Sequence, residues 1–108
     1  MGKFVVFNGT NGNFYFHLKA GNGEIILSSE SYTSKQNCFN GIASVKENAP
    51  HDANYELKDG YSNFTFNLKA ANGEIIGRSE NYTTRQGSEG GIEAVKRIAP
   101  TAPTENLT

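Results

Sequence analysis

The chain has 108 residues and a mass of 11.7 kDa, enough for one domain or for two small units that share a core. Apolar residues make up 36%, which together with 12 glycines is typical of a globular protein and argues against a disordered chain. The net charge of −1 argues against a chain that is basic throughout and binds nucleic acid, and no apolar run approaches the length of a membrane span. Cys38 is the sole cysteine, so no internal disulfide can form. The apolar stretch after Met1 is shorter than a signal-peptide core, and we expect a cytoplasmic protein.

The sequence repeats itself with an offset of 50 residues. Residues 13–50 align with residues 63–100, and 22 of these 38 positions are identical. Two units are too few for a solenoid, which needs about three to bury a continuous core, so we predict an intrachain pseudo-dimer. The predicted organisation is a single domain over residues 1–108, with a first repeat near 3–50, a second near 54–100, and a tail or short final strand at 101–108.

Each repeat contains a predicted hairpin. In the first, Phe14, Phe16, Leu18 and Ala20 alternate with polar residues, as on a strand with one buried face, and residues 64–70 repeat the pattern. Shorter strands are expected at Phe4–Phe7, Tyr55–Leu57 and Thr104–Leu107.

The turn of each hairpin is predicted from an Asn-Gly pair, Asn22-Gly23 in the first repeat and Asn72-Gly73 in the second. Both residues of such a pair tolerate the positive φ angles of a two-residue turn. This turn predicts three cross-strand pairs: Ala20 with Ile25 and Leu18 with Leu27 on the buried face, and Lys19 with Ile26 on the other.

A helix follows each hairpin. Thr33 and Thr83 each precede a glutamine by three residues, the spacing of a capping box that begins a helix. Gly41 and Gly91 lie within the predicted helices, which indicates close packing of helix on sheet. Prolines at 50 and 100 end the helices. The apolar positions at helical spacing are Phe39, Ile42, Val45 and Ala49, and Ile92, Val95, Ile98 and Ala99.

These elements predict an α+β fold in which two β-β-β-α repeats form one antiparallel sheet with both helices packed on one face. The other face of the sheet is expected to be open. Exposed apolar residues on such a face would mark a partner site or self-association. The residues predicted for this face are Phe4, Val6, Tyr15, His17, Lys19 and Ile26, with Thr65, Lys69, Ile76 and Arg78.

Groups that could carry chemistry are few. His17, His51 and Cys38 are replaced by Asn, Thr and Ser in the other repeat, and none is paired at a catalytic or metal-ligating spacing. The glycine-rich stretches match neither a dinucleotide-binding motif nor a phosphate-binding loop. We therefore expect no catalytic residues, no cofactor and no metal.

The corner between the hairpin and the helix is the main candidate partner-binding surface. Helix capping, the helix dipole and a ring covering the core explain much of its composition. The alternative is a recognition edge present twice, in which a cation beside tyrosine suits a phosphate or carboxylate group. The candidate residues are Ser29, Glu30, Tyr32, Lys35, Ser79, Glu80, Tyr82 and Arg85, together with Tyr15, Lys19 and Lys69 of the sheet.

Two copies of F-x-F-x-L-K-A-x-N-G-E-I-I, each followed by S-E-x-Y-T and a G-I-x-x-V-K helix, resemble the YegP-like family of small bacterial tandem-repeat proteins. The resemblance covers Phe4 to about Pro100. It implies units of three strands, a helix and a final strand that share one antiparallel sheet, with Tyr55–Leu57 and the stretch near Leu107 as exchanged strands. The family is of unknown function, so the resemblance carries over no site residues.

The leading hypothesis is a non-enzymatic, cytoplasmic bacterial module that binds a protein partner and is itself a monomer. One alternative is a small-molecule binder or small enzyme that uses Glu30 with Tyr32, or His17 with Lys19, in a cleft between the repeats. Another alternative is an RNA-binding module, because aromatic residues on a sheet can stack on bases. The balanced charge makes nucleic acid the weaker choice, and no membrane partner is expected.

Overall fold

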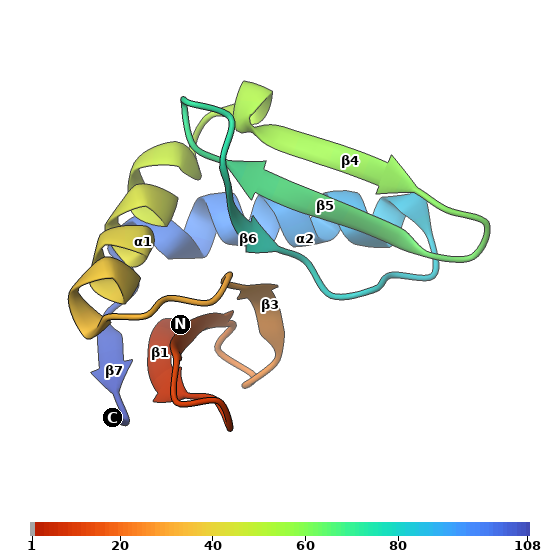
Figure 1. Ribbon diagram of the computed structural model, residues 1–108. Coiled ribbons are helices and arrows are strands. Elements are labelled where there is room, and N and C mark those ends of the chain that lie inside the picture. The colour runs from red at the N-terminus through yellow and green to blue at the C-terminus, as the bar shows by residue number, and fades with distance from the viewer. Residues whose placement is uncertain (1) are drawn as a thin grey trace.

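The computed structural model describes residues 2–108, which form seven strands, two helices and two short 3-10 turns (Figure 1). Both repeats have the predicted β-β-β-α order, and a final strand follows the second helix. The elements are β1 (Lys3–Asn8), β2 (Phe14–Lys19), β3 (Ile25–Ser28), α1 (Lys35–Asn48), η1 (Asp52–Asn54), β4 (Tyr55–Asp59), β5 (Phe64–Lys69), β6 (Ile75–Arg78), α2 (Arg85–Ile98), η2 (Ala99–Thr101) and β7 (Thr104–Asn106).

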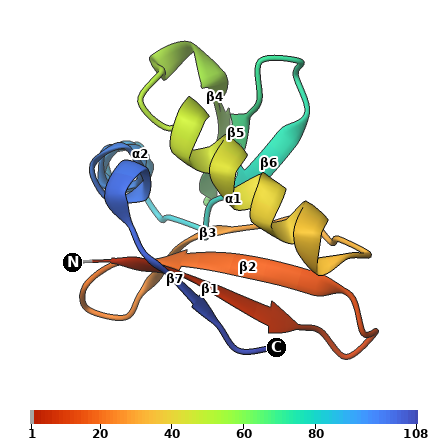
Figure 2. The same cartoon turned by 90° about the vertical axis from the view of Figure 1, so that its left-hand side faces the viewer.

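All seven strands form one sheet in the order β4-β5-β6-β3-β2-β1-β7. A pseudo-two-fold axis passes between β3 and β6, which pair only at Ser28 and Arg78. We call β1–β3 the first half and β4–β6 the second half. The strands from β4 to β1 are antiparallel, as predicted, but β7 pairs with β1 in parallel (Figure 2). β4, the strand after α1, pairs with β5, but the equivalent position beside β2 is occupied by β1. β7, the strand after α2, therefore pairs with the outer edge of β1.

The implied strand exchange agrees with this pairing. β4 follows α1 but pairs with β5 of the second half, and β7 follows α2 but lies on β1 of the first half. Each helix packs on the middle strand of its own half and on the third strand of the other half, so both helices bury one core. None of the helices formed by residues 2–108 is long and apolar enough to span a membrane.

The hairpin turn differs from the predicted two-residue form. The Ala20 amide donates to the Glu24 carbonyl over 2.8 Å, and the Gly23 amide donates to the Ala20 carbonyl over 2.9 Å. Only Gly23 has a positive φ, +87°, while Asn22 does not. These features define a three-residue loop with its glycine in the left-handed region. Ala20 therefore pairs with Glu24, and the predicted pair with Ile25 is wrong.

A bulge follows from the longer loop. Leu18 pairs with Leu27 as predicted, but Lys19 pairs with Ile25, so the predicted pair of Lys19 with Ile26 is wrong. Ile26 is the additional residue in β3. A residue inserted in this way changes the direction of its side chain, and Ile26 is 6% exposed and part of the core.

The side chains of β1 also face the opposite way from the prediction. Phe4 and Val6 lie across from core residues of β2 and are fully buried, whereas Val5 and Phe7 point to the other face. Ile76, placed on the open face by the sequence, is 7% exposed and belongs to the core, because β6 carries the same bulge as β3. The open face therefore loses four of its predicted apolar members and gains Val5 and Phe7.

Each helix is capped one residue after the predicted threonine, so the predicted caps at Thr33 and Thr83 are wrong. The Ser34 hydroxyl caps α1 by accepting from the Asn37 amide over 3.1 Å, and Thr84 caps α2 by accepting from the Gly87 amide over 2.9 Å. Each cap satisfies an amide that has no partner within the helix.

Close approach of helix to sheet at the two glycines is confirmed. A Cβ atom at Gly91 would lie 2.8 Å from Cζ of Tyr82, closer still to its hydroxyl oxygen, and 3.1 Å from Cε2 of Phe66. Gly41 has the same neighbours in the first half, Tyr32 and Phe16. Each helix thus rests on a tyrosine of the corner that precedes it.

The two halves differ at a core position between β3 and β6, close to the pseudo-two-fold axis. Leu27 of β3 corresponds to Gly77 of β6. A Cβ atom at Gly77 would lie 2.6 Å from Cγ of Leu27, so the leucine side chain occupies the space that a second side chain would need.

Candidate functional site

The serines of the corner satisfy backbone groups. Ser29 Oγ accepts from the Phe16 amide over 2.9 Å and donates to the Glu30 carbonyl over 2.8 Å. Ser79 makes the same two bonds in the second half. These bonds fix the chain where it leaves β3 and β6.

The corner tyrosines are held between sheet and helix. Tyr32 bridges to Phe14, with amide-to-carbonyl distances of 2.7 and 2.9 Å, and its ring stacks on Phe16 at a centroid distance of 6.3 Å. Burial raises the pKa of both Tyr32 and Tyr82. Both rings are half-buried against the helix glycines.

The charged residues of the corner lie apart from one another. Glu30 pairs with Arg78 over 2.6 Å and so connects the two halves near the pseudo-two-fold axis. Arg85 pairs with Asp59 over 3.4 Å on the arm formed by β4 and β5. Lys35 is exposed at the start of α1. The corner residues therefore do not converge on one pocket.

The face of the sheet opposite the helices carries a continuous row of side chains. Residues directly across from each other on neighbouring strands share a face. The row that crosses six strands consists of Val5, His17, Ser28, Arg78, Asn67 and Glu56.

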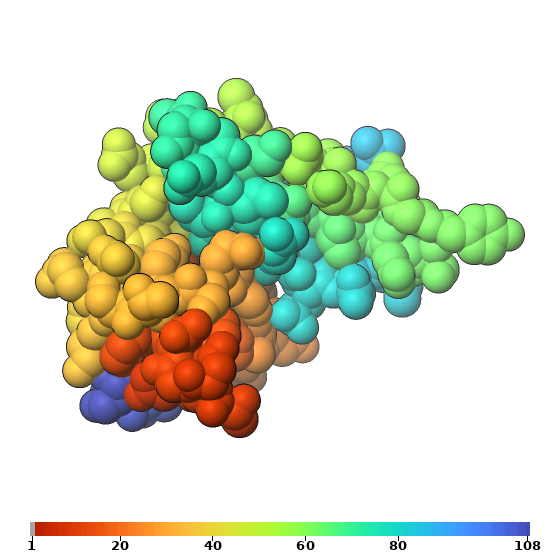
Figure 3. Space-filling model, viewed as in Figure 1, coloured from red at the N-terminus to blue at the C-terminus, as the bar shows by residue number. Residues whose placement is uncertain are grey.

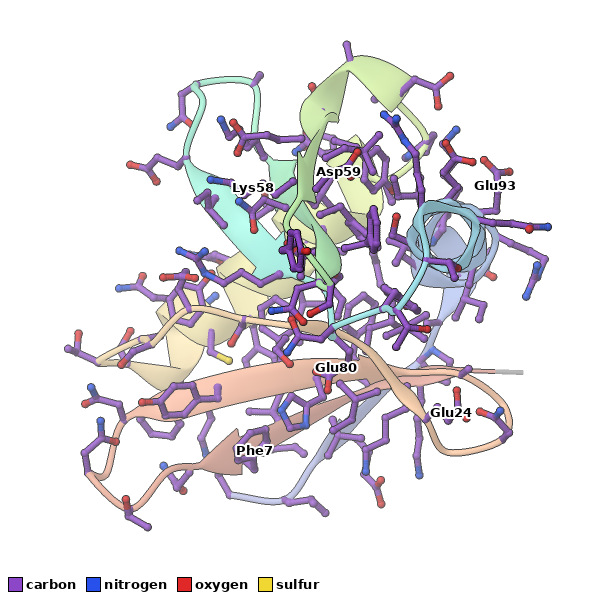
Figure 4. All side chains as sticks on the ribbon, turned by 90° about the vertical axis from the view of Figure 1, so that its right-hand side faces the viewer. Phe7, Glu24, Lys58, Asp59, Glu80 and Glu93 are labelled. Atoms are coloured by element: carbon purple, nitrogen blue, oxygen red, sulfur yellow. The ribbon has the colours of Figure 1, made fainter. Side chains whose placement is uncertain are left out.

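At the first-half end of this outer face, three aromatic rings are in contact. Phe7 stacks on Tyr15 at a centroid distance of 5.8 Å and lies 4.6 Å from the ring of His17. Figure 4 shows Phe7 on the side of β1 and β2 away from both helices. All three rings are partly exposed, and Val5, directly opposite His17 on β1, is buried. We call Phe7, Tyr15 and His17 the aromatic trio.

Hydrogen bonds and burial define the environment of the trio. The Tyr15 hydroxyl accepts from the Asn11 side chain over 3.1 Å, and side-chain hydrogen bonds, from Ser31 first, lower the pKa of Tyr15. Desolvation lowers the pKa of His17, assisted by Lys19 and opposed by Glu80. Burial therefore favours the uncharged form of the His17 ring.

The second half lacks this trio at its matching positions. Tyr15 and His17 correspond to Thr65 and Asn67 in the repeat, and the residue opposite Thr65 on β4 is Lys58. The second half makes the same backbone pairing with these polar residues. The fold therefore does not require aromatic rings here.

Cations on the outer face are largely paired. Lys3 contacts Glu105 over 2.8 Å, and Lys69 contacts Glu56 over 3.2 Å. Hydrogen bonds, from Asn67 first and then Lys69, lower the pKa of Glu56, and the bond from Lys3 lowers the pKa of Glu105. Lys19, beside the trio, is half-buried and has no carboxylate partner within residues 2–108.

Reactive groups are isolated within the described residues. Cys38 is fully buried, and burial raises the pKa of its thiol to about 11. Across residues 2–108, no three His, Cys, Asp or Glu side chains gather as a metal site would require. A cavity of about 770 Å³ lies where the first hairpin turn meets the end of α2, and Arg97 is its charged residue. Its other lining residues are Gly2, Ala20, Gly21, Asn22, Ile98, Thr101, Ala102 and Pro103.

Comparison with protein families identifies two copies of one domain, described as a domain of unknown function (DUF1508), at residues 10–56 and 61–106. The chain belongs to this family. Among curated relatives, it is 54% identical over 57 residues to the UPF0339 protein in the ptx operon 5′ region of Stutzerimonas stutzeri, and 53% identical over 58 residues to the YegP protein of Yersinia pestis. These matches cover 53% and 54% of this chain but only 51% and 52% of the relatives, about half their length.

A UPF0339 protein of Treponema denticola is 48% identical over 56 residues, which make up 52% of this chain and 97% of that relative. That relative therefore has the length of a single repeat. Among solved structures, the solution structures of SO3888 from Shewanella oneidensis and of YegP from Escherichia coli match with TM-scores of 0.94 and 0.93 and identities of 42% and 46%. Both cover 99% of this chain, and 92% and 93% of the solved chains. These proteins share the fold, and their family has no known function.

The sequence did not identify Phe7 as a surface residue. β1 is apolar at four successive positions, so alternation gave no direction for it. The signal that was available is the Tyr15 and His17 pair, whose cross-strand neighbours on β1 must share their face.

Proposed function

We propose that the chain is a non-enzymatic binding module that recruits a protein partner through the aromatic trio on the outer face. The observation that carries the proposal is the difference between the halves. The same backbone holds Phe7, Tyr15 and His17 on one side and Lys58, Thr65 and Asn67 on the other. Three touching aromatic rings that the fold does not need are typical of a recognition surface, since aromatic side chains are enriched at protein interfaces.

The charge distribution favours an apolar, weakly charged protein surface as the partner. Lys3, Lys69 and Arg78 already contact carboxylates, so they offer little to a phosphate backbone. The candidate surface keeps Tyr15 and Lys19 from the sequence prediction, with Glu80 beside His17. We assign the serines and tyrosines of the corners a supporting role, because their hydrogen bonds and rings hold the hairpins that present the trio. A buried free thiol at Cys38 is compatible with action in the cytoplasm.

A photo-crosslinking amino acid in place of Tyr15 tests the proposal, with the same amino acid in place of Thr65 as the matched control. The labelled proteins are incubated in bacterial lysate with and without nuclease, irradiated, and analysed by mass spectrometry. The proposal expects a nuclease-resistant protein adduct at position 15 that is missing at position 65. A variant with Phe7→Lys and His17→Asn, which copies the second half, should lose the adduct while keeping the circular dichroism spectrum.

Three outcomes would contradict the proposal. Equal adducts at both positions would indicate non-specific capture. An adduct that disappears with nuclease would favour RNA, whose binding should also weaken steeply with salt. No adduct at position 15 at any protein concentration would leave the trio without a partner and refute the assignment.

The cavity between the repeats favours a second candidate function, the binding of a small molecule with a carboxylate or phosphate group. Its volume of about 770 Å³ is within the range of ligand pockets, and Arg97 makes no ion pair within residues 2–108. A thermal-shift screen of anionic metabolites tests this candidate, because a ligand that binds the native state raises the melting temperature. A shift that the Arg97→Gln variant loses would support it. No shift across the panel would count against it.

A further inference from the structure

The outer strands of the two halves, β1 and β4, differ in their pairing. At the first-half edge, β7 lies on β1, with the Phe4 amide donating to the Pro103 carbonyl over 2.8 Å and the Leu107 amide donating to the Val6 carbonyl over 2.8 Å. At the second-half edge, β4 has β5 on one side and no strand of residues 2–108 on the other. In Figure 3 the hairpin of β4 and β5 projects from the rest of the molecule.

Side-chain burial reflects this difference. Leu57 of β4 lies opposite Phe66, as Val6 of β1 lies opposite Phe16, so the two residues are equivalent. Val6 is 0% exposed and Leu57 is 39% exposed. Beside Leu57, a groove of about 430 Å³ runs between β4 and α2, with Tyr55 and Ile92 among its apolar lining residues.

The backbone of β4 presents a symmetric set of hydrogen-bonding groups. Gly60 donates to Asn63 at the end of the hairpin, and hydrogen-bonded pairs alternate along an antiparallel ladder. The N–H and C=O groups of Leu57 therefore point outward from the sheet. The Tyr55 amide is already bonded to the Asp52 carbonyl, which leaves the Tyr55 carbonyl free to accept.

The side chains around Leu57 are complementary to the same side chains of a second copy related by a two-fold axis. In an antiparallel pair centred on Leu57, the two Leu57 residues exchange both backbone bonds, and the Tyr55 carbonyls accept from the Asp59 amides. Glu56 of each copy then lies opposite Lys58 of the other, at a position where side chains are closest. In Figure 4, Lys58 lies on one side of β4, and Glu93 of α2 lies on the other side.

We propose that the β4 edge binds a second copy of this chain, with the two β4 strands antiparallel about Leu57 and the sheets joined into one. The occupant is a second copy because the Glu56-Leu57-Lys58 order is self-complementary in charge, in apolar contact and in backbone bonding. A two-fold axis also gives a closed dimer, since each copy has one β4 strand and uses it in the contact. The aromatic trio takes no part in this contact and lies at the far end of the sheet.

Charge reversal at Glu56 and at Lys58, with the two variants measured alone and mixed, tests the proposal. Sedimentation velocity from about 10 µM to about 1 mM should show the native chain shifting from monomer toward dimer, within the range of a short, weak interface. Lys58→Glu alone and Glu56→Lys alone should each weaken self-association by about tenfold or more, because like charges then face each other. An equimolar mixture of the two variants should associate as well as the native chain, since every facing pair is again opposite in charge.

Three controls keep the result specific. Lys35→Glu changes the net charge equally at an exposed site far from β4 and should leave the dimer unchanged. Circular dichroism establishes that each variant is folded, which matters for Glu56→Lys because Glu56 also contacts Lys69. The variant with the trio replaced should still dimerise, which separates this proposal from the proposed function. A monomer over the whole concentration range overturns the proposal, as does a dimer insensitive to Lys58→Glu or a mixture that fails to associate.

Discussion

Two adjacent glycines of α2 allow the cost of close helix packing to be measured. Alanine at either position gains about 1 kcal/mol of intrinsic helix stability relative to glycine. At Gly90, a Cβ atom would have no neighbour within 4 Å, so Gly90→Ala should raise the free energy of unfolding by about 1 kcal/mol. At Gly91, the same atom would lie 2.8 Å from Cζ of Tyr82, well inside van der Waals contact.

The ring of Tyr82 cannot move freely, because it is half-buried and packed against the core and against Gly91 of the helix. Overpacking of this kind costs about 1–3 kcal/mol. Gly91→Ala should therefore be neutral to about 2 kcal/mol destabilising after the helical gain is included, and the two variants should differ by about 1–3 kcal/mol.

Urea unfolding followed by circular dichroism measures this difference. With a slope of about 1–3 kcal/mol per molar urea, a difference of about 2 kcal/mol separates the two midpoints by about 1 M. Tyr82→Phe removes the hydroxyl oxygen nearest to the new Cβ atom, so the penalty of Gly91→Ala should shrink in that background. If Gly91→Ala stabilised the protein as much as Gly90→Ala does, the close approach of α2 to Tyr82 would be wrong.

Other substitutions make further tests. Phe16→Ala and Phe66→Ala each empty a fully buried aromatic site and should lower the free energy of unfolding by about 3–5 kcal/mol; a loss below about 1 kcal/mol would contradict the placement of these rings. Since burial raises the pKa of Cys38 to about 11, against about 8.5 in an unfolded chain, the folded state disfavours the thiolate. Stability should be complete below pH 8.5 and fall as pH rises toward 11, and Cys38→Ser should remove that part of the fall in a pH series of urea midpoints. Gly77→Leu should destabilise strongly because its side chain would overlap Leu27, and adding Leu27→Gly should restore part of the melting temperature; no recovery would refute their complementary packing.

Local patterns in the sequence were enough to predict the elements and their order. Alternation placed Phe16 and Leu18 in the core because each apolar residue is followed by a polar one, and helical spacing did the same for Ile42 and Val45. The 50-residue offset then predicted the pseudo-dimer. These signals lie within a few residues of each other or repeat, so they can be recognised without a structure.

Features that depend on contacts between distant segments were not predictable in this way. Pairing with β2 determines which side chains of β1 face the core, because the apolar run of β1 itself favours neither face. The burial of Ile26 depends on a bulge, which follows from a loop one residue longer than the Asn-Gly pair suggested. Phe7 and Leu57 became candidate surface residues only through pairing across the sheet, whereas Tyr15 was already expected on the open face.

The packing of Leu27 against Gly77 has a consequence for how such a protein can evolve. In a symmetric pair of separate single-repeat chains, a residue at the two-fold axis must face an identical copy of itself. Joining two repeats in one chain removes that restriction, and here one copy became large and the other small. The halves are therefore no longer interchangeable: a chain with two first repeats would bring two leucines into one space, and a chain with two second repeats would leave that space empty. After such divergence, recombination between the repeats of one gene would be selected against.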